Sequence, residues 1–471
     1  MQFHSYLFLF LFLPASLAGY FGLCHFGRVR AARGFLILIS LLFYGYGNPW
    51  YLPILLGSAG FNWLFSRSLA GRSRGRLAVG IAANAGLLLY FKYVNFFIEN
   101  LNLIFSRDMA LLKILLPVGI SFFTFQQIAW LVDSWRGETR DCRFLDYLLF
   151  TVYFPKLAMG PILLQEEFIP QLHDPKRHRP DSKNLAEGLM LLSAGLFKKV
   201  ILAEFFAGPA GWGFAQIGAL SSMDAFLVML AYTFQLYLDF SGYCDMAVGV
   251  SMMFNLSLPQ NFDSPYKAMS PVDFWKRWHM TLTRFLRKYL YFPLGGSRRG
   301  KARTYINILI VFLVSGLWHG ANWTFVVWGL LHGLAQAFTR AFHKQWERLH
   351  PAFQWLATFL FVNLTWVIFR ADSLGQAKQF FGQLCRLGNT QVSQAFLYSL
   401  PLSRMPAVVE NHRMAAAAAI YGLTLFVLVN TENLGRSERK PTLLRGLATV
   451  IMLIWSVMSL AGVATFIYFQ F

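Results

Sequence analysis

Cysteine and charge are both scarce in this chain of 471 residues. The four cysteines, Cys24, Cys142, Cys244 and Cys385, lie far apart, so neither a disulfide framework nor a metal cluster follows from their spacing. Charged residues make up 14% of the chain, against about 25% in soluble proteins, whereas apolar residues make up 56%. These proportions exclude a disordered protein, a secreted disulfide scaffold and a receptor with a single span.

Long apolar stretches recur from Phe3 to Phe469 and predict an all-α, polytopic membrane protein. A helix needs about 20 residues to cross the hydrocarbon core, so we expect about 11–12 spans. The longer expected helices lie near residues 3–23, 77–98, 113–134, 185–206, 223–254, 304–319, 323–341, 352–370, 414–430 and 447–469, and two shorter ones turn at Asn48 and Pro49. No internal repeat is evident, which argues against a transporter built from two matching halves.

Lys and Arg outnumber Asp and Glu by 42 to 22, a formal net charge of +20. In a membrane protein such an excess marks cytoplasmic loops and contacts with anionic membrane lipids, and no nucleic-acid-binding motif accompanies it. Basic clusters at residues 28–33, 67–76, 176–179 and 436–445 therefore predict cytoplasmic loops, which place both termini on the outer side. The first apolar run lacks a basic start and a cleavage site, and predicts a retained helix.

Two predicted membrane segments are interrupted. Residues 145–163 contain two prolines and a lysine and predict a re-entrant segment, because broken backbone is tolerated at that depth only when protein encloses it. Residues 223–254 are too long for one straight span, and the polar run 239–243 predicts a break in that helix. Asp239 within this run either ties the broken helix together or faces a cavity.

The segment 273–303 carries nine Lys or Arg residues and one acidic residue, Asp273. Apolar residues recur at three- and four-residue steps from Phe274 to Tyr289, which predicts an amphipathic helix with a basic flank. Two interpretations stay open. The helix either directs its charges to lipid headgroups or forms a docking surface for an anionic donor, such as the phosphates of coenzyme A or of a phosphopantetheine carrier. The candidate donor-binding residues are Lys276, Arg277, Arg284, Arg287 and Lys288.

Two histidines are candidates for catalysis. His319 ends an apolar run that rises about 20 Å, short of the ~30 Å hydrocarbon core, and the next apolar helix begins at Trp323. We therefore expect a turn at 320–322 within the membrane, where the His319 imidazole can take and return a proton. The alternative is a histidine that only closes the turn. His279 falls inside the predicted amphipathic helix, where a structural hydrogen-bonding role is the alternative to catalysis, and His332 is expected to pack in the core.

Several catalytic motifs are missing from the sequence. There is no nucleophile elbow, P-loop, dinucleotide-binding fingerprint or His-Glu-x-x-His zinc site, and no His is followed five residues later by Asp. We expect no metal and no bound cofactor. A transporter or lipid flippase, and a membrane scaffold, remain alternatives to an enzyme.

The sequence resembles the membrane-bound O-acyltransferase superfamily, and within it the bacterial alginate O-acetylation membrane proteins. The resemblance rests on the intramembrane His319, preceded forty residues earlier by a second polar residue, here His279 in Trp278-His-Met-Thr-Leu282. Residues 371–412 resemble the family's sequences least. Further resembling stretches are Leu116 to Gln126, Tyr232 to Tyr243, Asn261 to Tyr266, Asp273 to Gly296, Leu317 to Gly329 and Phe466 to Phe471.

The resemblance implies an O-acetyltransferase with a single membrane-embedded domain over residues 1–471. Residues 1–144 would be its N-terminal helices, 145–343 its catalytic core and 344–471 its C-terminal helices. His319 would be the catalytic residue, and His279 would line the cytoplasmic approach to it along a central tunnel. The other tunnel-lining residues would be Trp278, Trp318, Asn322, Trp323, Asp239 and Tyr243.

The resemblance also implies partners and a location. Acetyl-coenzyme A or an acyl carrier thioester would be the donor substrate on the cytoplasmic side of a bacterial inner membrane, with both termini in the periplasm. A separate periplasmic acetyltransferase or SGNH-hydrolase-like protein would complete transfer to an exopolysaccharide such as alginate or cellulose. Within the family, the alternative is transfer of D-alanyl or another acyl group from a carrier protein to a cell-envelope polymer.

Overall fold

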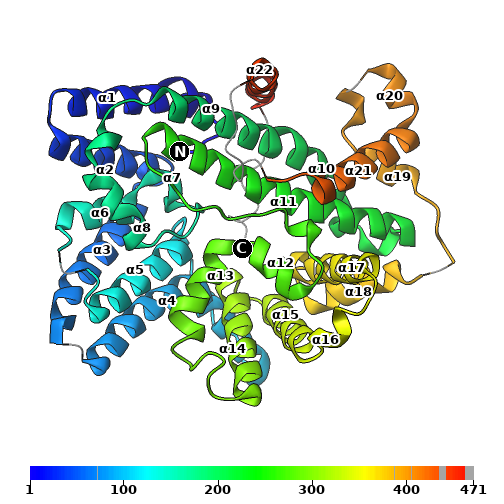
Figure 1. Cartoon of the computed structure of the whole chain (residues 1–471). Coiled ribbons are helices and arrows are strands. Elements are labelled where there is room, and N and C mark those ends of the chain that lie inside the picture. The colour runs from blue at the N-terminus through cyan, green and yellow to red at the C-terminus, as the bar shows by residue number, and fades with distance from the viewer. Residues whose placement is uncertain (72, 140, 387, 405, 434–441, 462–471) are drawn as a thin grey trace. The chain divides into compact units, whose positions relative to one another are not determined.

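The computed structural model describes residues 1–471 except 72, 140, 387, 405, 434–441 and 462–471 (Figure 1). The described residues form helices and connecting segments without a strand, which confirms the predicted all-α class. Six described helices are long and apolar enough to cross a membrane, and the larger number of spans stays a prediction. These six are Phe8–His25, Arg74–Phe105, Ser222–Met253, Lys301–His319, Pro351–Arg370 and Arg413–Asn430.

The chain divides into two compact units. Among the described residues, unit 1 comprises 1–196, 243–260 and 442–461, and unit 2 comprises 197–242 and 261–433. The basic residues Arg436, Arg439 and Lys440 of the expected cytoplasmic loop, and the end of the expected helix 447–469, lie outside the described residues.

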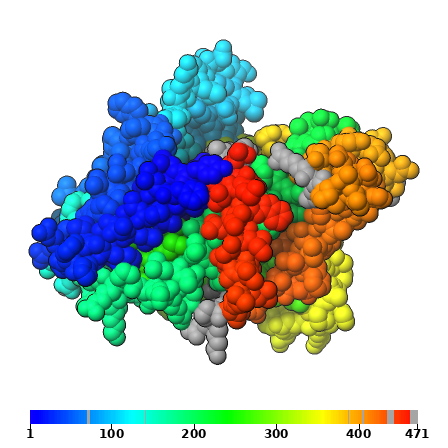
Figure 2. Space-filling model, turned by 90° about the horizontal axis from the view of Figure 1, so that it is seen from above, coloured from blue at the N-terminus to red at the C-terminus, as the bar shows by residue number. Residues whose placement is uncertain are grey.

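Unit 1 holds the N-terminal helices and one helix from the end of the chain. Its longer helices are α1 (Leu13–His25, preceded by the π-helical turn η1, Phe8–Phe12), α2 (Val29–Gly45), α3 (Tyr51–Arg67), α4 (Arg74–Phe105), α5 (Ile120–Arg136), α9 (Ser182–Phe197) and α22 (Leu443–Met458). Figure 2 shows α22, in red, beside the blue N-terminal segment, and the Tyr6 hydroxyl donates a hydrogen bond of 3.0 Å to the carbonyl oxygen of Val457. The polar turn at Asn48 and Pro49 separates α2 from α3, as predicted.

The predicted re-entrant segment is broken and enclosed. It forms α6 (Phe144–Val152) and α7 (Phe154–Leu157), followed by non-helical residues up to α8 (Gln165–His173). A helix of nine residues rises about 14 Å, too little to cross the hydrocarbon core. Every residue from 149 to 165 is buried. The Lys156 ammonium donates to the carbonyl oxygen of Thr151 at 2.9 Å and to Gln126 Oε1, so its polar atoms are satisfied inside the unit.

The predicted break at residues 239–243 is wrong. α11 (Ser222–Met253) is one continuous helix of 32 residues, of which residues 222–242 belong to unit 2 and the rest to unit 1. The carboxylate of Asp239 does not interrupt it, because its charge is balanced by a partner outside the helix. Asp239 Oδ1 forms an ion pair of 2.6 Å with Lys199 Nζ, and both side chains are almost fully buried. Lys199 itself lies in a π-helical turn, η4 (Lys198–Ala203), which precedes α10 (Glu204–Ala215).

Unit 2 carries a helical hairpin that the sequence predicts closely. α14 (Lys301–His319) and α15 (Trp323–Ala341) lie side by side in Figure 1. Gly316 and Gly329 let the two backbones touch, since a Cβ atom on either would come closer than 3.0 Å to a carbonyl oxygen of the other helix. Small residues serve helix packing in membranes in this way. The unit's other helices are α12 (Pro271–Arg277), α13 (Met280–Leu286), α16 (His343–Trp346), α17 (Pro351–Arg370), α18 (Leu374–Leu384), α19 (Gln394–Ser399), α20 (Ala407–Asn411) and α21 (Arg413–Asn430).

Candidate active site

The turn between α14 and α15 places His319 as the last residue of its helix. Gly320 follows with extended backbone, at φ −164° and ψ 156°. Asn322 caps α15, because its Oδ1 accepts a hydrogen bond of 3.0 Å from the backbone N–H of Thr324. Its Nδ2 donates to the carbonyl oxygen of Asp372 at 2.8 Å, which ties the turn to the residues after α17. The structure thus confirms the predicted turn at 320–322.

His319 lies in an aromatic enclosure. The side chain is only 5% exposed, so it faces neither bulk solvent nor lipid. Its ring centroid is 4.9 Å from that of Trp318, 5.1 Å from Trp328 and 5.3 Å from Phe369. Trp328 comes from α15 and Phe369 from α17, so three helices build the enclosure. Such walls exclude water, which strengthens electrostatic interactions inside the site.

His279 does not lie within a continuous helix, which corrects the sequence-based expectation. α12 ends at Arg277 and α13 begins at Met280, and His279 between them has left-handed backbone with φ 45° and ψ 51°. For a residue with a Cβ atom this conformation costs about 1–3 kcal/mol and persists only where the surroundings enforce it. A π-helical turn, η7 (Arg287–Tyr291), continues α13 directly, so the apolar steps of the sequence are divided only by the break at His279.

Asn261 holds His279 in place. The His279 ring is fully buried, and its Nδ1 lies 3.0 Å from Asn261 Oδ1. The same oxygen accepts hydrogen bonds from the hydroxyl of Thr281 at 2.9 Å and from its backbone N–H at 3.3 Å. Burial lowers the pKa of His279 from 6.5 to about 3, so its imidazole is neutral near neutral pH.

The two candidate histidines meet inside unit 2. Their ring centroids are 6.5 Å apart, although the residues are forty positions apart in the sequence. Trp318 contacts both rings, and Phe240 of α11 covers His279 at 4.9 Å. The two imidazoles therefore lie close enough to belong to one site.

The expected tunnel-lining residues fall into different surroundings. Trp278 and Trp318 are buried, and Trp278 stacks on Phe274 and packs against Trp366. Trp323 is 52% exposed, so it lies at the surface of the hairpin. Tyr243 belongs to unit 1, where its ring lies 5.2 Å from that of Phe3. A tunnel that reaches the two histidines stays a prediction.

The candidate donor-binding residues also differ from one another. Arg277 is held by acidic neighbours, with its Nε 3.0 Å from Asp273 Oδ1 and its Nη1 4.0 Å from Asp263 Oδ2. Lys276 and Arg287 are exposed. Arg284 and Lys288 are half-buried. Because acidic neighbours balance its charge, Arg277 is less suited to an anionic donor than the exposed Lys276 and Arg287.

His332 has a structural role, as predicted. Its Nδ1 accepts a hydrogen bond of 3.0 Å from Trp275 Nε1, and its Nε2 lies 3.0 Å from Thr365 Oγ1. Thr365 Oγ1 itself donates to the carbonyl oxygen of Val362, so it accepts the proton of His332 Nε2. Both ring nitrogens are thus engaged, and His332 is a core residue that joins α12, α15 and α17.

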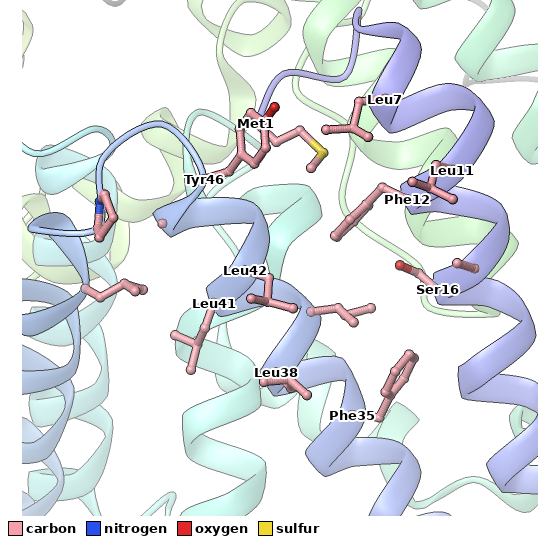
Figure 3. Close-up of a pocket in the computed structure, with 15 residues that line it drawn as sticks. Met1, Leu7, Leu11, Phe12, Ser16, Phe35, Leu38, Leu41, Leu42 and Tyr46 are labelled. Atoms are coloured by element: carbon pink, nitrogen blue, oxygen red, sulfur yellow. The ribbon is translucent and has the colours of Figure 1, made fainter.

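An apolar pocket of about 770 Å³ lies in unit 1, between α1 and α2 (Figure 3). Phe12 and Leu11 of the first span line one side, and Leu38 and Leu42 of α2 line the other. No histidine, acidic or basic side chain lines it. The pocket therefore suits hydrocarbon, since almost all of its lining side chains are apolar.

Comparison with known families identifies the family of the chain. The model of the membrane-bound O-acyltransferase family matches residues 120–374, which include His279, His319 and the aromatic residues described around them above. The chain belongs to the membrane-bound O-acyltransferase family. It is therefore an O-acyltransferase, as the resemblance of its motifs implied.

Curated relatives of this acyltransferase cover most of its length. It is 42% identical to a peptidoglycan O-acetyltransferase of Helicobacter pylori, over 80% of this chain and 78% of the relative. It is 38% identical to the probable alginate O-acetylase AlgI of Pseudomonas aeruginosa, over 84% of this chain and 76% of the relative. A teichoic acid D-alanyltransferase of Streptococcus thermophilus is more distant, at 25% identity over 48% of this chain.

Three features of the site escaped the sequence-based reasoning. Asn261 was part of a resembling stretch but had no role assigned, since its bonds to His279 and Thr281 bridge about twenty residues of sequence. Gly316 and Gly329 form a close contact between α14 and α15. The sequence does carry a signal for it, because a glycine in an apolar helix often marks a helix–helix contact. Phe369 offered no signal, because nothing in its own helix marks it as a neighbour of a histidine.

Proposed function

We propose that this protein is an O-acetyltransferase that takes an acetyl group from a cytoplasmic thioester and passes it to the hydroxyl groups of a polysaccharide outside the cytoplasm. The observation that carries the proposal is the buried pair His279 and His319, with ring centroids 6.5 Å apart. The names of the relatives support the acetyl group and the polysaccharide acceptor, since peptidoglycan and alginate are both polysaccharides.

In this proposal His319 acts as a general base. The acceptor hydroxyl oxygen forms a bond to the thioester carbonyl carbon while the imidazole of His319 removes the hydroxyl proton. The carbon–sulfur bond then breaks, and the thiolate leaves with that proton. The products are an ester and a free thiol, so atoms and charge balance. The aromatic walls exclude water, which would otherwise compete with the acceptor and hydrolyse the thioester.

His279 supports the reaction from the opposite side of the reacting group. Because burial keeps its imidazole neutral, its second nitrogen can exchange a proton with the thioester sulfur or the acceptor. The acetyl donor is acetyl-coenzyme A or an acyl carrier thioester. Lys276, Arg284, Arg287 and Lys288 give a basic approach for its phosphates.

A partner and a location complete the proposal. The protein lies in a bacterial inner membrane, with both termini in the periplasm, and a tunnel leads from the cytoplasmic side to the two histidines. A separate periplasmic acetyltransferase of the SGNH-hydrolase type receives the acetyl group and completes the transfer. The final acceptor is the polymer that this partner binds.

The test is the replacement of His319 by alanine in cells with matched protein levels. Polysaccharide-bound acetate, measured separately in peptidoglycan and in exported polysaccharide, is expected to fall to background. His343 provides the control, because it is exposed and pairs with Glu347 one turn away on the surface, so His343→Ala should leave acetate unchanged. Normal acetate with the His319 variant would refute the proposal.

An assay on the purified protein identifies the acyl donor. Labelled acetyl-coenzyme A should lose its acetyl group in the presence of acceptor, with free thiol appearing in equal amount. Transport of an intact solute without thioester consumption would indicate a transporter instead. Transfer of label from a D-alanyl carrier protein, but not from acetyl-coenzyme A, would place the protein with its more distant D-alanyltransferase relatives.

A further inference from the structure

Three donors around one oxygen atom decide the protonation of His279. Asn261 Oδ1 accepts a hydrogen bond from the backbone N–H of Thr281, and a backbone N–H can only donate. This atom is therefore the carbonyl oxygen of the amide, and not its nitrogen. Since an oxygen of this kind only accepts, His279 Nδ1 must carry a proton and donate it over the 3.0 Å between them.

We propose that Asn261 is a positioning residue that fixes His279 as the Nδ1–H tautomer and so makes Nε2 its basic nitrogen. The inference rests on the proposed function, in which His279 exchanges a proton with the reacting groups. A neutral imidazole has one N–H, so a proton held at Nδ1 leaves Nε2 as the acceptor. Second partners of this kind commonly decide which ring nitrogen does the chemistry.

The backbone around Asn261 also helps to hold His279 in position. The Asn261 carbonyl oxygen accepts a hydrogen bond of 2.9 Å from the N–H of Met280, and the Asp263 N–H donates 2.9 Å to the carbonyl oxygen of Arg277. These two bonds flank His279 on both sides and hold its left-handed backbone. Asn261 therefore fixes the place of the histidine with its main chain and the orientation of the ring with its side chain.

The surroundings of the ring limit what else could set its protonation. His319 of α14 is a titratable neighbour of this ring, with 6.5 Å between the ring centroids. The Asp239–Lys199 ion pair lies next to Phe240, the α11 residue that covers the ring, and the Asp263–Arg277 pair lies in the flanking segments. Substitutions at Asn261 leave all of these groups in place.

The test compares four substitutions in purified full-length protein, with acetyl transfer from labelled acetyl-coenzyme A followed across pH. Asn261→Ala removes the acceptor, and kcat is expected to fall about 10- to 100-fold while KM for the donor changes little, because misplacement of a reacting group by about 1 Å has this effect. Asn261→Asp keeps an acceptor oxygen and adds negative charge that favours the imidazolium. It should retain more activity than Asn261→Ala and move the acidic limb of the kcat/KM profile to higher pH.

Thr281→Val is the matched control. It removes a hydroxyl bond to the same oxygen but leaves the bond to His279, so its kcat and pH profile should stay close to those of the parent protein. A wild-type rate in Asn261→Ala would overturn the inference. So would an unshifted pH profile in Asn261→Asp, which also decides the matter if the alanine variant does not fold. Full activity in His279→Ala would instead refute the proposed role of His279, whatever the Asn261 variants do.

Discussion

Replacing Gly316 with alanine is expected to displace His319 without changing it. Gly316 lies three residues before His319 on α14. A Cβ atom there would come closer than 3.0 Å to the carbonyl oxygen of Phe325 and would lie 3.2 Å from the Cα atom of Gly329, both on α15. These are backbone atoms, so no side-chain rotation relieves the contact, and the two helices must separate by on the order of 1 Å.

The loss of activity should exceed the loss of stability. Overpacking of this kind costs about 1–3 kcal/mol, and alanine recovers about 1 kcal/mol because it is the better helix former. The net cost is about 0–2 kcal/mol, which leaves the protein folded. A displacement of about 1 Å at a reacting group can cost about 100-fold in rate. We therefore expect acetyl transfer by Gly316→Ala to fall about 10- to 100-fold.

The assay measures acetyl transfer from labelled acetyl-coenzyme A and thermal unfolding on the same purified samples. Gly422→Ala on α21 is the matched control, since no atom lies within 4 Å of a Cβ there. It should keep full activity and be slightly more stable. If Gly316→Ala transfers acetyl groups at the wild-type rate, the backbone contact between α14 and α15 does not position His319.

Three further predictions concern buried polar groups. The unfolded protein protonates His279 near pH 6.5, whereas the folded protein does so only near pH 3, so stability falls as the pH drops below 6.5. At pH 5 the loss is about 2 kcal/mol, and unfolding of His279→Gln should show a correspondingly weaker pH dependence. Lys199→Met strands the buried carboxylate of Asp239 and should cost about 3–5 kcal/mol by denaturant unfolding, with part of the loss recovered by adding Asp239→Asn. His332→Leu leaves the indole N–H of Trp275 without its acceptor and should cost about 1–3 kcal/mol, while acetyl transfer per folded molecule stays well above that of His319→Ala.

The sequence predicts well those elements that local signals define. The helices that meet at the 320–322 turn have the predicted inner ends, because apolar runs stop at His319 and resume at Trp323. α17 and α21 also match the expected spans to within a residue at each end. Period and composition suffice for these helices, since lipid requires each one to satisfy its own backbone.

Long-range contacts account for what the sequence does not predict. The apolar steps from Phe274 to Tyr289 indicate one helix, yet bonds from Asn261 to Met280 and Thr281 enforce a break at His279. The polar run beginning at Asp239 indicates a break, yet Lys199 neutralises that carboxylate and α11 continues. In both cases the deciding partner lies about twenty to forty residues away in the sequence.

In the candidate site, too, local sequence signals are predictable and long-range contacts are not. His319 is marked by its own neighbours in the sequence, since an ionisable residue at the end of an apolar run is costly and conspicuous. The enclosure around it is not marked, because Trp328 and Phe369 are ordinary residues of apolar helices until the fold brings them to the ring. Sequence alone therefore indicates the candidate catalytic residue but not the aromatic walls around it.

The most direct test of the central claim, that the two imidazoles serve one reaction, is a double-mutant cycle on the rate of acetyl transfer. His279→Ala, His319→Ala and the double variant are compared with the wild type in purified protein at saturating donor. Residues that act as a unit give a double variant no slower than the slower single variant, and this is the result expected here. Losses that multiply in the double variant would contradict the account, because the two rings would then act independently.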